Sequence, residues 1–444
     1  MRISLPQPEQ FSAIFETIMS EKLNRPVSGV TIDSRNLNEG DLFIAIDGEK
    51  FDGHDFLSDV NDSGASAAIV RKKYINIELQ QIKSEDPIKT LAEIAKEYRN
   101  QFKLPIVGIT GSNGKTSTKE LLKHVLSKQF EVHSTLNNQN TLIGLSLNLL
   151  RISNQHDISI LEIGASKKGE IKRLCKIAQP THGLITNVSS AHLEGFGSIQ
   201  NVANEKSELF KTLNGGVAFV NSTDQYIRKI KFKCKKINFG FKPNCDFSAD
   251  ISKEQDGKLT LILNTKIIPT FSYNLSFLKN LIAVSTIAIT LGLKWQDLID
   301  QVKTFTPPSG RCKVYVKNNI TIIDDTYNAN LASTLASLEY LKAFSNRGRK
   351  IFVFGDMYEL GDSSKKQHQL VGEKCSELNI DAVFTLGKHS KETNFALNQK
   401  NTGHHFFSKN DLVKTLKQDI RHGDIVLVKG SRGMAMEKVI EEAF

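Results

Sequence analysis

Cysteine and tryptophan are scarce in this sequence, and the spacing of the cysteines excludes two kinds of site. The chain of 444 residues contains five cysteines and one tryptophan. The cysteines are odd in number, widely scattered and without a CxxC pair, so we expect neither a disulfide framework nor a zinc site. This cysteine usage favours a reduced, cytoplasmic compartment.

Apolar runs long enough to cross a membrane are also missing. The longest run, Leu281–Leu293, is shorter than the roughly 20 residues that a membrane span needs, and it contains Ser285 and Thr286. We expect it to form a core helix. The first residues, MRISLPQPEQ, lack a basic region followed by an apolar core, so no secretory signal is expected.

No dense block of basic residues interleaved with aromatic residues is present, and we therefore expect no nucleic-acid binding. The chain has 58 Lys and Arg against 48 Asp and Glu, a formal net charge of +10 that is spread along its length. This excess suits a small polyanionic substrate. The contents of apolar residues, 39%, and charged residues, 24%, are typical of a globular protein.

Strand-like and helix-like segments alternate, which predicts an α/β protein of three domains. We expect an N-terminal α/β domain at residues 1–83 and a central domain at 84–306, a parallel sheet covered by helices. A small β insertion is expected near residues 241–275. Two prolines after Thr306 break any helix there, and residues 307–444 are expected to form a Rossmann-like, doubly wound domain.

A glycine-rich loop follows the apolar strand candidate Ile106–Ile109 and precedes a helical segment. Residues Gly108–Ser117 read GITGSNGKTS. Strand, glycine-rich loop and helix is the context of a loop that binds phosphate through backbone N–H groups and the helix N-terminus. We expect Lys115 to contact the β- and γ-phosphates of a nucleoside triphosphate and Thr116 to bind Mg²⁺. The strict GxxxxGK[ST] pattern would have glycine in place of Ile109, and a glycine-rich turn that binds nothing is the disfavoured alternative.

Three polar residues become candidates for a metal site only in combination. Glu162 ends the strand candidate Ile158–Ile163, and a carboxylate at the C-terminal end of a parallel strand faces the ligand crevice. His192 lies in a loop after another strand candidate, and Lys206 lies in the helical segment NEKSEL. Taken singly, a carboxylate such as Glu162 is equally often a solvated strand end. A lone histidine is more often structural, and a lone lysine on a helix is more often a solvated charge.

Motifs along the whole chain resemble the Mur ligase family of peptidoglycan synthesis. In chain order they are TIDSRNLNEGDLFIAIDGEKFDGHDF, GITGSNGKTS, LEIGASKKGEI, NVSSAHLEGFGS with NEKSEL, PPSGR, DDTYNAN, FGDMYELGDSSKKQH and VKGSRGMAMEKV. DDTYNAN and GDMYELG resemble the branch that adds D-alanyl-D-alanine. No DNPR-type motif of the branch that adds diaminopimelate or lysine is present.

The resemblance implies an ATP-dependent amide ligase of cytoplasmic peptidoglycan precursor synthesis. It would join D-alanyl-D-alanine to UDP-N-acetylmuramoyl-tripeptide through an acyl phosphate, with ATP and two Mg²⁺ ions as cofactors. The N-terminal domain would bind the UDP-sugar, the central domain ATP, and the C-terminal domain the amine substrate while it closes over ATP. We expect a monomer whose partners are these small molecules, with no membrane span.

The resemblance also implies the roles of particular residues. The implied catalytic residues are Lys115, Glu162, His192, Lys206 and Arg311. The implied ATP-binding residues are Gly111, Ser112, Asn113, Gly114, Lys115, Thr116, Ser117, Asn280 at adenine, Arg311 at the γ-phosphate and Asp325 at the ribose. The implied substrate-binding residues are Ser34, Arg35 and Asp52 for UDP, Asn138 and Asn140, Tyr327, Asn328 and Asn330 for the amine, and Lys429, Ser431 and Arg432 for a carboxylate. The implied metal ligands are Thr116, Glu162, His192 and Lys206, the last as a carbamate because a cationic ammonium group does not bind Mg²⁺.

Two segments depart from the family pattern. TLNNQNTLIGLS has Asn137 in place of a glycine, Thr141 in place of an asparagine and Ser146 in place of a proline. Asparagine tolerates the backbone angles of glycine better than most residues do, so we expect the shape of this loop to be kept. Before Asn280, Asn274 and Ser276 replace the glycine and histidine of the family pattern GxHxxxN.

Other functions remain open from the residues alone. A P-loop kinase or NTPase would need a Walker-B aspartate and an arginine-rich lid, and Glu162 stands where that aspartate is expected while no such lid is visible. A folylpolyglutamate-type enzyme, or a divergent paralogue of the same superfamily that acts on another peptide, is a further alternative. The DSR segment favours a UDP-sugar over folate and leaves the paralogue open. A non-catalytic nucleotide-binding scaffold is disfavoured because it needs no second metal site.

Overall fold

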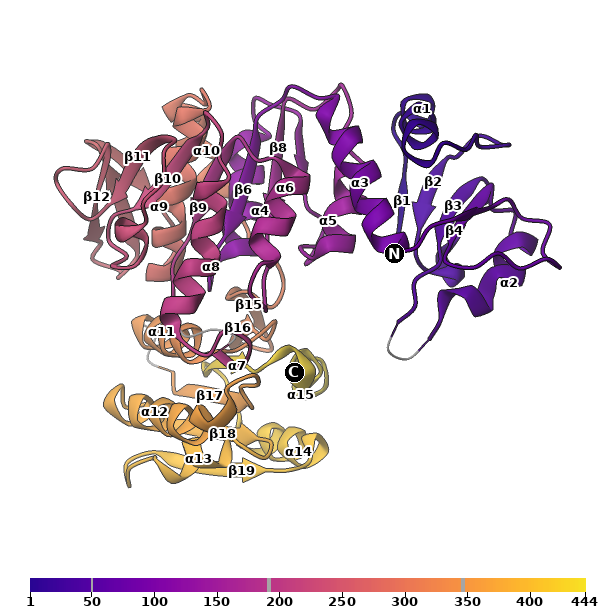
Figure 1. Cartoon of the computed structure of the whole chain (residues 1–444). Coiled ribbons are helices and arrows are strands. Elements are labelled where there is room, and N and C mark those ends of the chain that lie inside the picture. The colour runs from indigo at the N-terminus through magenta and orange to yellow at the C-terminus, as the bar shows by residue number, and fades with distance from the viewer. Residues whose placement is uncertain (49–50, 190–192, 345–347) are drawn as a thin grey trace.

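Three α/β domains follow one another along the chain, as the alternation of strands and helices predicts (Figure 1). The structure, a computed structural model, describes residues 1–48, 51–189, 193–344 and 348–444. In Figure 1 the N-terminal domain lies beside the central domain and the C-terminal domain lies below it. Within the described ranges no helix is long and apolar enough to cross a membrane.

The N-terminal domain contains a five-stranded sheet in the order β1-β2-β3-β4-β5, in which β1 is antiparallel to β2 and the other pairs are parallel. Its strands are β1 (Arg2–Ser4), β2 (Gly29–Thr31), β3 (Asp41–Ile44), β4 (Ala67–Val70) and β5 (Gln81–Lys83). Its helices are α1 (Pro8–Met19) and α2 (Leu57–Asp62), and α3 (Pro87–Asn100) follows the last strand.

The central domain contains a nine-stranded sheet in the order β14-β13-β12-β11-β10-β9-β6-β8-β7. Its strands are β6 (Ile106–Thr110), β7 (Val132–Ser134), β8 (Ile158–Glu162), β9 (His182–Ile185), β10 (Val217–Asn221), β11 (Lys235–Gly240), β12 (Phe247–Lys253), β13 (Leu259–Leu263) and β14 (Lys266–Pro269). The predicted β insertion consists of β12, β13 and β14, which add an antiparallel edge to an otherwise parallel sheet. Its helices are α4 (Lys115–Leu126), α5 (Leu142–Leu149), α6 (Glu170–Ala178), α7 (Leu193–Phe196), α8 (Ile199–Lys211), α9 (Leu275–Thr290) and α10 (Trp295–Thr304).

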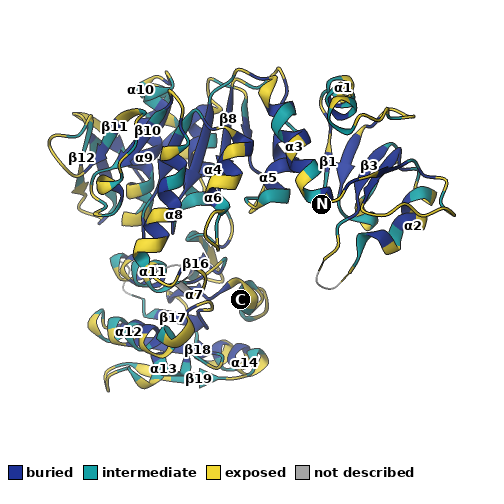
Figure 2. Ribbon diagram, in the orientation of Figure 1, coloured by how far each residue is buried: buried dark blue, intermediate teal, exposed yellow. Residues whose placement is uncertain are grey.

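The C-terminal domain contains a six-stranded sheet in the order β15-β16-β20-β17-β18-β19, parallel except for the β15 edge. Its strands are β15 (Lys313–Lys317), β16 (Ile320–Asp325), β17 (Lys350–Gly355), β18 (Ala382–Leu386), β19 (Thr402–Phe406) and β20 (Ile425–Lys429). Its helices are α11 (Leu331–Ala343), α12 (Ser364–Glu377), α13 (Lys391–Phe395), α14 (Lys409–Asp419) and α15 (Glu437–Ala443). Figure 2 shows the strands of these sheets as the buried layer beneath partly exposed helices.

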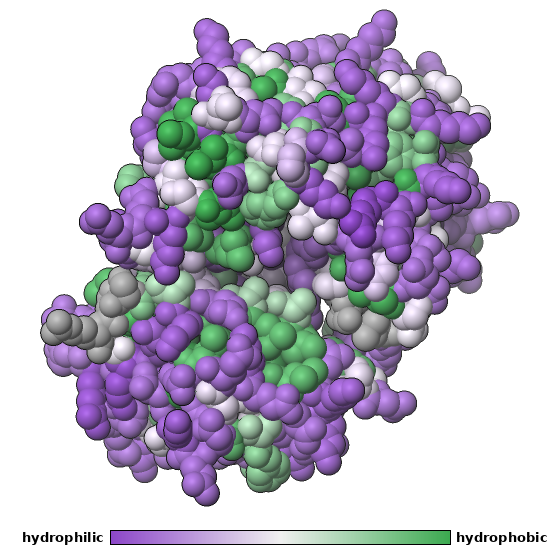
Figure 3. Space-filling view, turned by 90° about the vertical axis from the view of Figure 1, so that its left-hand side faces the viewer, coloured by the Kyte–Doolittle hydropathy of each residue, from purple (hydrophilic) through white to green (hydrophobic). Residues whose placement is uncertain are grey.

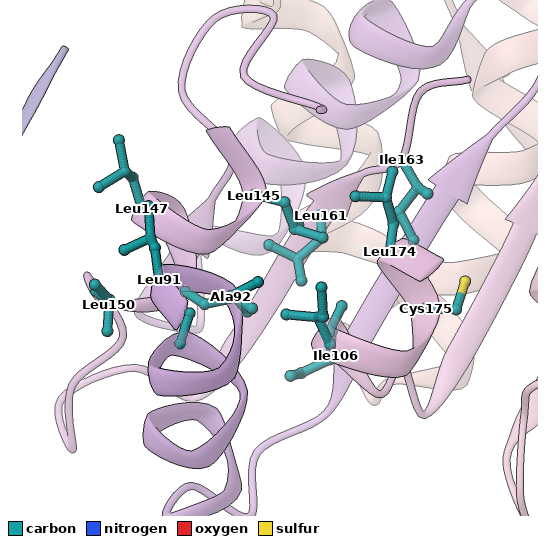
Figure 4. Close-up of a cluster of buried hydrophobic side chains, with 14 of the residues drawn as sticks. Leu91, Ala92, Ile106, Leu145, Leu147, Leu150, Leu161, Ile163, Leu174 and Cys175 are labelled. Carbon is teal, nitrogen blue, oxygen red and sulfur yellow. The ribbon is translucent and has the colours of Figure 1, made fainter. Parts of the chain in front are cut away.

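One hydrophobic core joins the N-terminal and central domains through α3. This helix begins at Pro87 because the Asp86 carboxylate accepts a hydrogen bond from the amide of Lys89 and proline suits the first helical position. Leu91 and Ala92 of α3 point toward α5, α6 and the strands β6 and β8 (Figure 4). The same cluster continues into the sheet of the N-terminal domain, whereas the faces of the C-terminal sheet belong to two other clusters.

The expected core helix is α9, but it begins earlier and ends sooner than the apolar run. It starts after Asn274, whose side chain accepts hydrogen bonds from the amides of Ser276 and Phe277, and it ends at Thr290. Gly292 follows with a φ of 97°, in the left-handed region that favours glycine. Leu281 to Ala288 are buried, so the sequence indicated the buried part of the helix rather than its ends.

Candidate functional site

A cleft of about 950 Å³ lies between the central and C-terminal domains. Figure 3 shows the surface hollowed between these two parts of the molecule. The predicted site residues that line the cleft are Ser112, Asn113, Gly114, Lys115, Thr116, Ser117, Asn138, Asn140, Glu162, Asn280, Arg311, Asp325, Tyr327, Asn328, Asn330 and Lys429. Residues that are distant in sequence therefore share one cavity.

The phosphate loop turns sharply from β6 into α4, and its glycines are needed for that turn. Gly111 has a φ of 151°, and a Cβ there would lie 1.9 Å from Oγ1 of Thr186. Gly114 has a φ of 79° and caps α4. The first intrahelical bond runs from the amide of Thr118 to the carbonyl of Gly114, so the three preceding amides have no partner within the helix and can bind an anion.

Lys115 lies at the start of α4 and donates from Nζ to the carbonyl of Gly111 at 2.9 Å. Burial lowers the pKa of Lys115, Glu162 raises it, and the nearby cation Arg311 lowers it further. Two cations from different domains thus face the same space, and an anion placed between them would be stabilised.

The loop after β9 braces the phosphate loop from behind. The amide of Asn113 donates to Oδ1 of Asn187 at 3.1 Å, and Nδ2 of Asn187 donates to the carbonyl of Asn113 at 2.9 Å. Oγ of Ser112 donates to the carbonyl of Ser189 at 3.1 Å. Asn187 and Ser189 were not predicted as site residues, although polar residues at the C-terminal end of β9, the strand beside β6, were a usable signal.

Glu162 sits at the end of β8 and is almost fully buried, with 2% of its surface exposed. Its Oε2 accepts a hydrogen bond from Oγ1 of Thr116 at 2.7 Å, and its Oε1 accepts one from Nδ2 of Asn140 at 2.7 Å. The two predicted metal ligands Thr116 and Glu162 are therefore in contact. Their hard oxygen donors are of the kind that Mg²⁺ prefers.

A buried lysine that the sequence analysis missed holds the loop that carries Asn138 and Asn140. Nζ of Lys119 donates to the carbonyl of Thr135 at 2.6 Å and to that of Asn137 at 3.4 Å. Asn137 has a φ of 47°, so the asparagine adopts the left-handed conformation that glycine favours, as expected from its place in the family pattern. One turn of α4 separates Lys119 from Lys115, but the loop acceptors of Lys119 are backbone carbonyls, which no residue type in the sequence marks.

Lys206 is buried in α8, with 2% of its surface exposed. Burial, followed by the positive charge of Lys115, lowers the pKa of Lys206 to about 7, whereas Glu205 raises it. Within the described residues its ammonium group has no hydrogen bond or ion pair. His192, its predicted partner at a metal, lies outside the described residues, and no group of three or more His, Cys, Asp or Glu side chains forms a metal centre in the ranges that the structure describes.

The C-terminal domain forms the opposite wall of the cleft. The guanidinium group of Arg311 stacks 3.9 Å above the ring centre of Tyr327. Nζ of Lys429 is ion-paired with Asp325 at 2.5 Å and also donates to the carbonyl of Asn328 at 2.9 Å. These contacts engage Asp325 and Lys429 with each other, so their predicted contacts with ribose and substrate stay predictions.

Asn280 approaches the phosphate loop from α9. A Cβ built on Gly114 would lie 2.8 Å from Oδ1 of Asn280, which places this amide beside the phosphate loop; its contact with adenine stays a prediction. Asn274 and Ser276, the two departures from the family pattern, lie at the capped start of the same helix and line the cleft.

The remaining predicted residues lie outside the lining of the cleft. Gly111 directly follows β6, Lys206 lies in α8, and Ser431 and Arg432 follow β20, where the amide of Tyr358 donates to Oγ of Ser431 at 2.8 Å. Ser34, Arg35 and Asp52 lie in the N-terminal domain. Arg35 is exposed and lowers the pKa of Asp33 to about 2, and Oδ1 of Asp52 accepts hydrogen bonds from the amide and ring of His54.

Comparison with known proteins gives matches along almost the whole chain. The Mur ligase family, catalytic domain matches residues 26–99, the Mur ligase middle domain residues 109–285, and the Mur ligase, glutamate ligase domain residues 310–432. The chain is 33% identical to the UDP-N-acetylmuramoyl-tripeptide–D-alanyl-D-alanine ligase of Escherichia coli (strain K12), with 93% of each chain covered. MurF from Acinetobacter baumannii is similar with a TM-score of 0.89 and 28% identity over 97% of this chain and 98% of that chain. MurF from Thermotoga maritima in complex with ADP is similar with a TM-score of 0.85 and 30% identity over 96% and 97%.

Proposed function

The chain belongs to the Mur ligase family, and from that premise we propose that it is a MurF-like, ATP-dependent ligase. It joins D-alanyl-D-alanine to UDP-N-acetylmuramoyl-tripeptide in peptidoglycan precursor synthesis, acting as a monomer in the cytoplasm. The observation that carries the proposal is the cleft in which the phosphate loop with Glu162 faces Arg311 and Asn330 of the C-terminal domain. A nucleotide, a carboxylate and an amine meet at such a boundary.

Bringing two anions together is the first problem that this reaction poses. The carboxylate of the tripeptide must approach the γ-phosphate of ATP, and both carry negative charge. Lys115 and Arg311 supply fixed positive charge from two sides of the cleft. Preorganised charge in a partly desolvated site stabilises the negative charge that gathers on the transferred phosphoryl group.

Two bond exchanges complete the proposed reaction. A carboxylate oxygen attacks the γ-phosphorus, the bond to the β-phosphate oxygen breaks, and ADP and an acyl phosphate result. The neutral amine of the dipeptide, after loss of one proton from its ammonium form, attacks the acyl carbon. The nitrogen loses a second proton, which the departing phosphate accepts, and the bond from the acyl carbon to the phosphate oxygen breaks, which releases phosphate and leaves the amide. The loop of Tyr327, Asn328 and Asn330 is proposed to orient the amine.

The residues present fit a magnesium ion beside the phosphate loop. Thr116 and Glu162 place two oxygen donors together at 2.7 Å, and Asn140 fixes the carboxylate from the other side. These two residues would hold the ion, which supplies charge neutralisation to the phosphate oxygens when it is bound. The oxygen donors of Thr116 and Glu162 suit a hard cation, and Asn140 would keep the carboxylate oriented for it.

Lys206 is proposed to react with CO₂ and to carry a carbamate. Only a neutral amine attacks CO₂, and a pKa of about 7 leaves a large fraction of this amine neutral at physiological pH. The nitrogen bonds to the carbon of CO₂ and loses a proton, which converts a buried amine, without a hydrogen bond or ion pair among the described residues, into a carboxylate-like anion. Because the neutral fraction falls below pH 7, the carbamate is expected to be lost as the pH decreases.

The Lys206→Ala variant tests this role. We expect activity to fall by about 100-fold or more and to return in part when a short-chain carboxylic acid is added, because the acid replaces the missing anion. The Lys211→Ala variant, at the exposed end of the same helix, is the control. Full activity of Lys206→Ala without added acid would contradict the carbamate.

Phosphate release with each substrate omitted in turn tests the ligase assignment. The proposal predicts sustained release only when ATP, UDP-N-acetylmuramoyl-tripeptide and D-alanyl-D-alanine are all present, with the amide product detected by mass spectrometry. Release that does not depend on the dipeptide would instead support an NTPase or kinase and would remove the ligase assignment.

A further inference from the structure

One hydrogen bond joins the phosphate loop to the C-terminal domain across the cleft. Nδ2 of Asn330 donates to Oδ1 of Asn113 at 2.7 Å, and 217 residues of sequence separate the two. Both side chains line the cleft. We propose that this amide bridge positions the C-terminal domain on the phosphate loop and couples nucleotide binding to the place of residues 327–330.

The Asn113 end of the bridge is held firmly. Its Nδ2 donates to Oγ of Ser189 at 3.0 Å, and its backbone carbonyl accepts from Oγ1 of Thr186 at 2.6 Å. With Asn187 bound to its amide as well, the residue has little freedom to turn. Its Oδ1 is therefore presented to the cleft at a fixed point of the loop that binds phosphate.

The Asn330 end is equally defined, because the same side chain caps a helix. Oδ1 of Asn330 accepts a hydrogen bond from the amide of Ser333, and Oγ of Ser333 accepts one from the amide of Asn330. This capping box starts α11 at Leu331. The oxygen of the side chain thus serves the helix, and its nitrogen reaches the phosphate loop.

The hydrogen bond between Asn113 and Asn330 fixes the orientation of the C-terminal domain more than it adds to the strength of its contact with the central domain. Apolar contact between the two domains is available elsewhere, where the rings of Tyr273 and Phe344 lie 5.1 Å apart. Such contact has little directional preference, whereas a hydrogen bond weakens steeply with misalignment. A phosphate group that orders the phosphate loop further therefore also restricts α11 and the adjoining Tyr327 and Asn328, which lie just before the cap.

The functional meaning of this coupling rests on the proposed ligase function, in which the 327–330 loop orients the amine. The Asn330→Ser variant separates the two tasks of the side chain. Serine is also a favoured N-cap, so the helix is kept, but its side chain is too short to reach Asn113. The reverse exchange Ser408→Asn, at the N-cap of α14, is the matched control.

Amide hydrogen exchange with and without a non-hydrolysable ATP analogue and Mg²⁺ tests the coupling without any need for turnover. We expect the analogue to slow exchange in residues 331–337 of the unmodified chain and of Ser408→Asn. In Asn330→Ser we expect this protection to fall severalfold while protection of residues 111–118 remains. Equal protection of residues 331–337 in all three proteins would overturn the proposal.

A second variant keeps the test decisive if Asn330→Ser is unstable. Asn113→Ala removes the same bond from the other side and leaves the cap of α11 untouched. If the two side chains share one bond, Asn113→Ala loses the same protection in residues 331–337 as Asn330→Ser. The double variant is then expected to lose no more protection than the more affected single variant. Additive effects of the two substitutions would contradict a shared bond.

Kinetics then connect the bridge to the reaction. Loss of one neutral hydrogen bond is expected to raise the KM for D-alanyl-D-alanine by about twofold to tenfold, with the KM for ATP less affected in Asn330→Ser. An unchanged KM for the dipeptide would overturn the link to the amine site. A chain that shows the exchange coupling but forms no amide would refute the proposed function and leave the bridge intact.

Discussion

At the scale of single residues, Lys119 shows how a buried charge can organise a loop that is distant in sequence. Its side chain is fully buried, with Glu120 as an ion-pair partner at 2.7 Å and two loop carbonyls as acceptors. A buried ammonium with three acceptors satisfies all its donors. The loop that precedes Asn138 and Asn140 is thereby tied to the helix that begins at Lys115.

The Lys119→Met variant is expected to loosen this loop. Without the ammonium group the carbonyls of Thr135 and Asn137 lose their partner, and we expect the free energy of unfolding to fall by about 2–4 kcal/mol. The value of kcat/KM for the UDP substrate should fall more than that for ATP. Denaturant titration and steady-state kinetics measure both effects, with the exposed Lys128→Met as control. Equal losses for the two substrates would argue against a loop-specific role.

His133 predicts a loss of stability in acid. It is buried beside Ser159 at 2.8 Å, and burial, followed by the charge of Arg151, lowers its pKa from 6.5 to about 3. Because the folded pKa lies below the unfolded value, the folded state binds fewer protons between pH 6.5 and pH 3. Stability is therefore full above about pH 6.5 and falls toward pH 3, by at most about 1.4 kcal/mol per pH unit for this group.

Denaturant unfolding at several pH values tests this assignment. The His133→Asn variant keeps a polar group near Ser159 but does not titrate, so its stability should depend less on pH between 6.5 and 4 than that of the unmodified chain. The exposed residue His422 provides the control variant His422→Asn. A pH dependence that is identical in the unmodified chain and His133→Asn would assign the acid sensitivity to other groups.

At the scale of elements, α3 joins two domains through one apolar face. Leu91 is buried, with 1% of its surface exposed, in the cluster that reaches both sheets. We expect Leu91→Ala to lower the free energy of unfolding by about 2–5 kcal/mol, because a cavity would remain between elements that cannot collapse independently. The exposed Glu93→Ala on the same helix is the control, and urea unfolding is the measurement. A change of similar size in both variants would contradict this role of the apolar face.

Elements were predictable where a strand carries its own signal. The strand candidates Ile106–Ile109 and Ile158–Ile163 coincide closely with β6 and β8, because buried parallel strands are continuous apolar runs. By contrast, β19 reads TGHHF and lies at a sheet edge, where pairing with β18 rather than apolar character defines it. No local pattern in such a segment marks it as a strand.

The candidate site was predictable to the extent that each residue belongs to a motif. Lys115, Thr116 and Glu162 come together in one cleft because they lie at the ends of the adjacent parallel strands β6 and β8 or directly beyond them. The contact between Asn113 and Asn330 was not predictable, because it depends on the angle between two domains. The support from Lys119 was missed for a related reason, since its partners are backbone carbonyls that leave no trace in sequence.

At the scale of the whole molecule, the distribution of cores predicts which parts fold alone. The C-terminal sheet is covered on both faces by clusters drawn almost entirely from residues 307–444. One face of the N-terminal sheet, in contrast, packs into the cluster that contains α3 and the central domain. We expect a fragment of residues 307–444 to fold cooperatively and a fragment of residues 1–83 to remain unfolded. Circular dichroism during thermal unfolding measures both, and a cooperative transition in the 1–83 fragment would contradict the shared core.

The fusion of two domains by α3 has a further consequence under the proposed function. If the UDP end of the substrate is held in the N-terminal domain and its reacting carboxylate beside Glu162, the distance between the two ends is set by one continuous core. The joined N-terminal and central domains would then fix the length of the nucleotide-sugar peptide that fits the site. A substrate whose peptide is one residue shorter than the tripeptide would bind by its UDP end, but its carboxylate would not reach the γ-phosphate. In a substrate one residue longer, the carboxylate would extend past the γ-phosphate. Selection for peptide length would thus depend on the fixed arrangement of the two joined domains, whichever side chains contact the peptide.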